Sequence, residues 1–97
     1  MNEELRELRK SIDNLDNALV AILVERFRLT EKVGIFKADK DLPAIDEDRE
    51  KSQKLTFKRL ADYYGMNDGI VIEIMDVIIK IVRKRHDEIK SLNSKLD

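Results

Sequence analysis

The amino-acid sequence predicts an all-α protein with three helices per chain, a very long first helix, and a homodimer in which the long helices pair. Three observations predict this. Apolar residues follow helical spacing, only 3 Gly and 1 Pro interrupt the 97 residues, and the first apolar series is too long for one compact domain. We expect a single domain over residues 1–97, with a core of about residues 5–92 and a frayed tail at residues 93–97.

The first expected helix begins at Leu5 and ends between Phe36 and Asp39. Its apolar residues are spaced three and four apart, which places them on one helix face. The same spacing, continued from Ile22, leads to Arg26, so a guanidinium occupies a position where an apolar side chain is usual. The apolar series, called the first-helix stripe below, comprises Leu5, Leu8, Ile12, Leu15, Leu19, Ile22, Leu29, Val33 and Phe36.

The length of this helix predicts the dimer. The 32 residues from Leu5 to Phe36 span roughly 48 Å, whereas a compact chain of 97 residues is about 32 Å across. Part of the first-helix stripe would stay in water unless a second chain covered it. We therefore expect a homodimer with two-fold symmetry.

A loop and a second helix follow. Residues 38–44 are expected to connect the helices, because Pro43 disfavours helical geometry at Leu42. The second helix should start near Asp46, where acidic residues favour a helix N-terminus, and should stop at Gly65.

The third helix is expected to start at a cap formed by Asn67 or Asp68 and to continue to about Leu92. It repeats apolar residues at helical spacing. The residues expected to be buried are Ile70, Ile74, Val77, Ile78, Ile81 and Val82.

Composition excludes several function classes. The 19 basic and 20 acidic residues are interspersed, and this balance argues against nucleic-acid and membrane-surface partners. There is no Cys and 1 His, so we expect no metal site and no cofactor. No signal-peptide core and no membrane-length apolar run is present, so we expect a cytoplasmic protein.

The candidate binding residues are cations beside the first-helix stripe. Lys37 lies almost three whole turns after Arg26, so the two share a helix face. Arg9 flanks the same stripe but lies about 25 Å before Arg26 along a straight helix. One small ligand cannot touch both arginines of one chain. In an antiparallel pair of helices, however, Arg9 of one chain can approach Arg26 and Lys37 of the other.

A second polar group, called the second-helix cluster below, consists of Asp46, Arg49 and Glu50 on one helix face. Two interpretations are open. Glu50 or Asp46 could neutralise Arg26 in a structural ion pair. Alternatively, the cations of the first helix hold a small dianion, and the carboxylates accept hydrogen bonds from its hydroxyl.

Charged and apolar residues form one pattern along the first two helices: Leu8, Arg9, Ile12, Asp13, Asp16, Leu19, Glu25, Arg26, Leu29, Val33, Lys37, Pro43, Asp46, Arg49 and Glu50. This pattern, extended over about residues 5–90, resembles the all-helical chorismate mutase family. The resemblance implies an intertwined homodimeric helical bundle that converts chorismate to prephenate, on the route to Phe and Tyr, without a cofactor. Each site would take one arginine from the partner chain.

The resemblance also implies residue roles. Arg9 of the partner chain and Arg26 would bind the two substrate carboxylates, and Lys37 would donate to the ether oxygen. The second-helix cluster would surround the ring hydroxyl, with Glu50 as the direct acceptor.

The third helix departs from the family pattern. The family places a small hydroxyl residue at the position of Val82 and a Gln or Glu donor at the position of His86. His86 either replaces this donor or is a surface residue in the basic helix end of residues 83–86. The expected catalytic residues are Arg26, Lys37, Glu50 and His86. The expected substrate-binding residues are Arg9, Arg26, Lys37, Asp46, Arg49, Glu50, Val82 and His86.

Two other functions are open. The first is a lyase on the same scaffold that splits pyruvate from isochorismate, and the second-helix cluster counts against it. The second is a non-catalytic helical dimerisation module, which gives no reason for the positions of Arg26 and Lys37.

Overall fold

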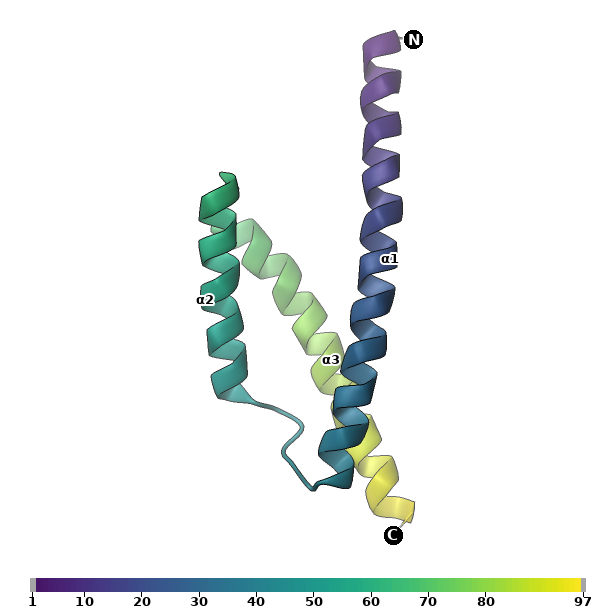
Figure 1. Cartoon of the computed structure of the whole chain (residues 1–97), viewed down its shortest axis with the longest axis vertical. Helices are drawn as coiled ribbons and strands as arrows, with labels where there is room; N and C mark the ends of the chain where they lie inside the picture. Colours follow the sequence, from purple (N-terminus) through teal and green to yellow (C-terminus); the bar gives the residue numbers. More distant parts are fainter. Residues whose placement is uncertain (1, 97) are drawn as a thin grey trace. The chain divides into compact units, whose positions relative to one another are not determined.

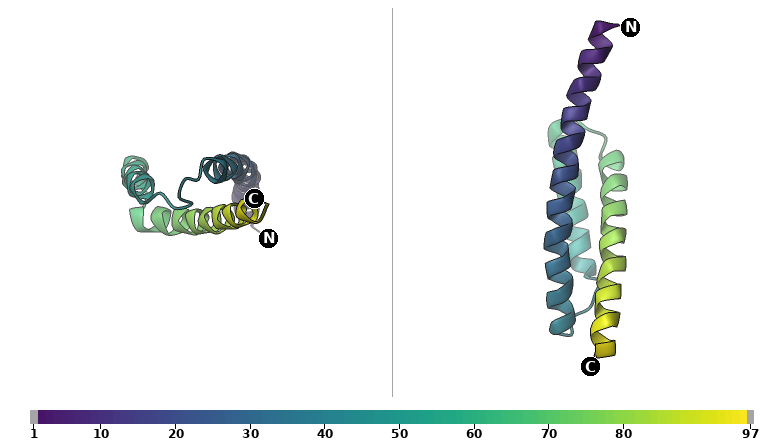
Figure 2. Two further views of the ribbon diagram at one scale, coloured as in Figure 1. Left: turned by 90° about the horizontal axis from the view of Figure 1, so that it is seen from below. Right: turned by 90° about the vertical axis from the view of Figure 1, so that its right-hand side faces the viewer.

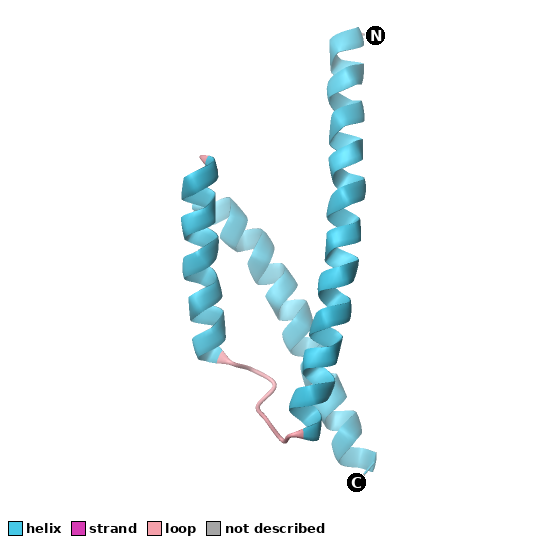
Figure 3. Ribbon diagram, viewed as in Figure 1, coloured by secondary structure: helices cyan, strands magenta, loops and turns pink. Residues whose placement is uncertain are grey.

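The computed structural model describes residues 2–96, which form three α-helices and no strand. The helices are α1 (Glu3–Asp39), α2 (Glu47–Tyr64) and α3 (Asp68–Leu96), joined by short loops (Figures 1 and 3). The predicted all-α class, with three helices and a long first one, is confirmed. The chain divides into two units between Thr30 and Glu31, so α1 contributes to both. None of the helices in residues 2–96 is long and apolar enough to cross a membrane.

The first unit contains the N-terminal part of α1. The side chain of Asn2 accepts hydrogen bonds from the backbone N–H groups of Glu4 and Leu5, at 2.8 and 3.3 Å, and so caps the helix. Glu3 and Glu4 lie in the first turn, where negative charge is favourable. The large apolar residues of the first-helix stripe in this unit are between 40% and 70% exposed. The stripe of the single chain is therefore open to solvent.

Helix α2 begins and ends where local sequence predicts. The carboxylate of Asp46 accepts a hydrogen bond from the backbone N–H of Arg49, at 3.0 Å. Gly65 ends the helix with a left-handed φ of 73°, and its N–H donates to the carbonyl of Asp62. The predicted boundaries of α2 are confirmed.

Helix α3 starts at the expected cap but ends later than predicted. The side chain of Asn67 accepts from the N–H of Gly69 at 2.8 Å. The helix continues past Leu92 to Leu96, through most of the expected tail, whereas Asp97 lies outside the described residues. The amide of Asn93 donates to the carbonyl of Ala38 at 3.2 Å, which satisfies a carbonyl at the end of α1 and anchors this part of α3.

The second unit packs residues 31–39 of α1 and helix α2 against α3. Helix α2 runs antiparallel to α3, and Lys58 pairs with Asp68 near the connecting turn at 3.1 Å. Residues 31–39 follow the C-terminal half of α3 in the parallel direction (Figure 2). The buried residues in the part of this unit whose burial the structure describes, residues 31–93, are Gly34, Ala38, Ala61, His86 and Ile89.

The expected burial on α3 is wrong for the single chain. Ile78 and Val82 are half-buried, but Ile70, Ile74, Val77 and Ile81 are between 49% and 58% exposed. The reason is that α3 contacts its neighbours through another face. That face includes Met75, Ile79, Val82, His86 and Ile89.

Candidate functional site

Lys37 lies in the last turns of α1 and is half-buried. Its ammonium donates to the backbone carbonyl of Ala44 at 3.2 Å. The loop reaches the lysine because the N–H of Leu42 donates to the carbonyl of Lys37 at 2.8 Å, and Asp41 turns the chain with a φ of 54°. The sequence therefore places this cation over the connection to α2.

A hollow of about 460 Å³ opens beside Lys37. Its polar lining consists of this lysine and the acidic start of α2, Asp46, Glu47 and Asp48. Asp46 uses its side chain to cap the helix. The structure thus brings together two of the predicted site residues, Lys37 and Asp46.

Glu50 has a partner that the sequence interpretation did not include. Arg83 of α3 donates from Nε to one carboxylate oxygen of Glu50 at 2.8 Å, and from Nη2 to the other oxygen. The hydrogen bonds to Glu50 raise the pKa of the Arg83 guanidinium. Arg83 belongs to the basic helix end of residues 83–86, and the packing of α3 against α2 is what brings it to Glu50, 33 residues away.

The Glu50–Arg83 pair lines a second hollow, of about 250 Å³, between α2 and α3. Glu47 lines both hollows. The second-helix cluster is therefore divided, with Asp46 in the hollow of Lys37 and Glu50 in that of Arg83. The side chain of Arg49 is exposed and lines neither.

His86 is buried, with 5% of its surface exposed. It lies against Gly34, where an added Cβ would come within 2.6 Å of the imidazole Cδ2 and 3.1 Å of Nε2. The interpretation of His86 as a surface residue is therefore wrong. The role of His86 as a donor stays a prediction. The substrate contact expected for Val82, which is half-buried about one turn earlier, also stays a prediction.

The two arginines of the first unit that were predicted as site residues differ in burial. Arg9 is exposed, whereas Arg26 is half-buried. Atom Nη1 of Arg26 is buried and has no hydrogen-bond partner among residues 2–96. A buried guanidinium nitrogen without a partner is unfavourable, so this position is suited to an incoming anion.

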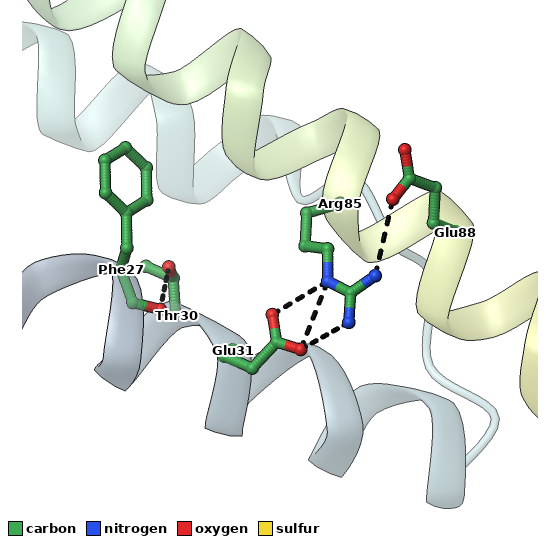
Figure 4. A network of polar contacts seen from close by, with 5 residues as sticks. All are labelled: Phe27, Thr30, Glu31, Arg85 and Glu88. Carbon is green, nitrogen blue, oxygen red and sulfur yellow. Dashed lines mark hydrogen bonds and ion pairs between the residues drawn. The ribbon is translucent and has the colours of Figure 1, made fainter. Parts of the chain in front are cut away.

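A further ion pair joins α1 to α3 within the second unit, away from the two hollows. The guanidinium of Arg85 binds Glu31 at distances from 2.6 to 3.1 Å and also binds Glu88 at 3.3 Å (Figure 4). The hydrogen bond from Arg85 lowers the pKa of Glu31. This pair resembles the Glu50–Arg83 pair in chemistry but lines neither hollow.

The described residues contain no group of three or more His, Cys, Asp or Glu side chains that could hold a metal ion. Fold and polar residues define an all-helical protein with half-buried cations suited to a small anion. Residues 8–87 match the chorismate mutase type II family, and the chain belongs to that family. The resemblance seen in the sequence is confirmed.

The chain is similar in sequence to three relatives of known name. The chain is 30% identical to the chorismate mutase of Methanocaldococcus jannaschii, over 98% of this chain and 100% of the relative. It is 26% identical to the 4-amino-4-deoxychorismate mutase of Streptomyces venezuelae, over 94% of this chain and 88% of the relative. A segment of 49 residues is 41% identical to the bifunctional chorismate mutase/prephenate dehydratase of Aquifex aeolicus, covering 50% of this chain and 14% of that protein.

Proposed function

We propose that this protein is an isomerase that converts chorismate to prephenate by a Claisen rearrangement, on the route to Phe and Tyr. Family membership and similarity over the full length of a relative named chorismate mutase support this activity. The observation that carries the site is the half-buried guanidinium of Arg26, with its unpartnered nitrogen. A dianionic substrate would supply the missing acceptor.

The rearrangement suits a site without a nucleophile or a metal. The ether C–O bond breaks while a C–C bond forms within one molecule, so no proton has to be transferred. Catalysis then requires the substrate to be held in a compact conformer, with cations where negative charge grows on the ether oxygen. A donor at that oxygen binds the transition state more strongly than the ground state, which raises the rate.

We assign Arg26 and the partner chain's Arg9 to the two carboxylates. Lys37 would exchange its bond to the carbonyl of Ala44 for one to the ether oxygen. Glu50 would accept from the ring hydroxyl, and the substrate would extend from the hollow of Glu50 to that of Lys37 and Asp46, since Glu47 lines both. Arg49 would contact the same end of the substrate.

The third helix completes the proposed site. Val82 would contact the substrate without a polar side-chain group. Buried His86 would replace the Gln or Glu donor of the family at the ether oxygen.

We further propose an intertwined homodimer of single-domain chains, because two apolar surfaces are exposed. One is the first-helix stripe, and the other is the α3 face that includes Ile70, Ile74, Val77 and Ile81. Exposed surfaces of this kind are typical of chains that associate. A second copy would cover them and would bring Arg9 to the opposite site. We also propose a cytoplasmic location.

The proposal is tested with purified protein in two assays. The first follows the loss of chorismate absorbance in the ultraviolet, and the second follows pyruvate release from isochorismate. We expect activity in the first only. Pyruvate release alone would favour the lyase, and activity on neither substrate would favour the dimerisation module; neither alternative is favoured by relatives named as mutases.

A further inference from the structure

We infer that Arg83 is a positioning residue that sets substrate specificity: by pairing with Glu50, it favours a ring hydroxyl over a protonated amine. The inference rests on the proposed function, in which Glu50 faces the substituent at this ring position. Arg83 itself need not touch the substrate, because it acts through the carboxylate.

The geometry of the Glu50–Arg83 pair lets Glu50 bind Arg83 and still accept a hydrogen bond from the substrate. Arg83 binds the two oxygens of Glu50 from one side, and the side chains are 39% and 24% exposed. A carboxylate has about four acceptor positions, and a bidentate arginine occupies two of them. Glu50 therefore keeps acceptor capacity for a hydroxyl, while Arg83 holds its orientation.

The charges around the pair are balanced. The hollow is lined by three acidic and three basic side chains, with Ile79 as the apolar member. They are Glu47, Glu50, Asp76, Lys51, Lys54 and Arg83. Loss of Arg83 would leave one negative charge in the hollow without a balancing cation. This charge would lie on Glu50, because Glu50 is the carboxylate that pairs with Arg83.

Two substrates differ at the relevant group. As its name states, 4-amino-4-deoxychorismate has an amino group where chorismate has the ring hydroxyl, and the Streptomyces venezuelae relative is named for acting on it. An alkyl amine is largely protonated at neutral pH. An unpaired carboxylate attracts such a cation, whereas a carboxylate already paired with a guanidinium attracts it much less.

The test compares kcat/KM for both substrates at pH 7 in the wild type, Arg83→Met and Arg83→Lys. We expect the ratio of amino substrate to chorismate to rise about tenfold or more in Arg83→Met. Arg83→Lys keeps the charge and should keep the ratio close to that of the wild type. Should Arg83→Met not fold, Arg83→Gln removes the same charge with a polar side chain.

Arg85→Met is the matched control, because Arg85 lies on the same helix and also binds a glutamate. Its ratio should stay unchanged. An unchanged ratio in Arg83→Met or Arg83→Gln, or an equal change in Arg85→Met, would overturn the inference while leaving the proposed function intact. A wild type without activity on chorismate would instead overturn the proposed function, and the inference with it.

Discussion

The imidazole of His86 occupies the space in which Gly34 would otherwise carry a side chain. Residues 31–39 approach α3 closely because the helix has no Cβ at this point, and Ile89 contacts the same position. A glycine within a helix costs about 1 kcal/mol relative to alanine. Here the glycine allows two helices to approach each other closely, and the only histidine of the chain is buried between them.

Gly34→Ala should therefore destabilise the protein despite the better helix propensity of alanine. The new Cβ would lie 2.6 Å from Cδ2 of His86 and 2.8 Å from Cδ1 of Ile89. We expect the free energy of unfolding to fall by about 1–2 kcal/mol, measured by urea denaturation. The same change made in a His86→Ala background should cost less, because part of the clash is removed. An equal cost in both backgrounds would contradict the proposed contact.

His86→Gln tests the proposed donor. Glutamine can donate a hydrogen bond through its side-chain amide, whereas leucine cannot. We expect His86→Gln to keep or raise turnover of chorismate and His86→Leu to lower it by about 100-fold. Equal turnover in the two variants would exclude the role.

Mixed dimers test the shared site. Arg9→Ala and Arg26→Ala homodimers should each lose activity by about 100-fold or more, because each site lacks one carboxylate ligand. Unfolding and remixing the two variants together should restore up to one working site per heterodimer. Each variant remixed alone is the control. No recovery would mean that both arginines of a site come from one chain.

The Glu31–Arg85 pair makes stability depend on pH. Because Arg85 lowers the pKa of Glu31 in the folded state, the pair stabilises the fold above the ordinary carboxyl pKa of 4.5. This contribution is lost as the pH falls through the lowered value. Arg85→Gln should therefore reduce the melting temperature at pH 7, and the difference from the wild type should shrink in acid.

Lys84→Gln serves as the control for this pair, since Lys84 is an exposed lysine on the same turn. It should change the melting temperature less than Arg85→Gln at pH 7. High salt should also reduce the difference between wild type and Arg85→Gln, because both partners are partly exposed. A difference independent of pH would show that the pair does not act through the Glu31 charge.

Much of the secondary structure could be predicted from sequence because its determinants are local. Asp46 caps α2 through a hydrogen bond to a residue three positions away, and Gly65 ends it through its own φ. The spacing of the first-helix stripe indicated one long helix and drew attention to Arg26. Periodicity and capping involve neighbours in the chain, so the amino-acid sequence alone determined them.

Other features were decided only by tertiary structure. Glu50 binds Arg83, 33 residues away, and His86 is buried because Gly34 lies opposite it. The uncovered face of α3, which includes Ile70, was expected to be buried. A helical pattern states which residues share a face, but not which neighbour that face meets. The packing of α1, α2 and α3 determines which neighbour each helix face meets, since burial and ion pairing depend on contacts between distant segments.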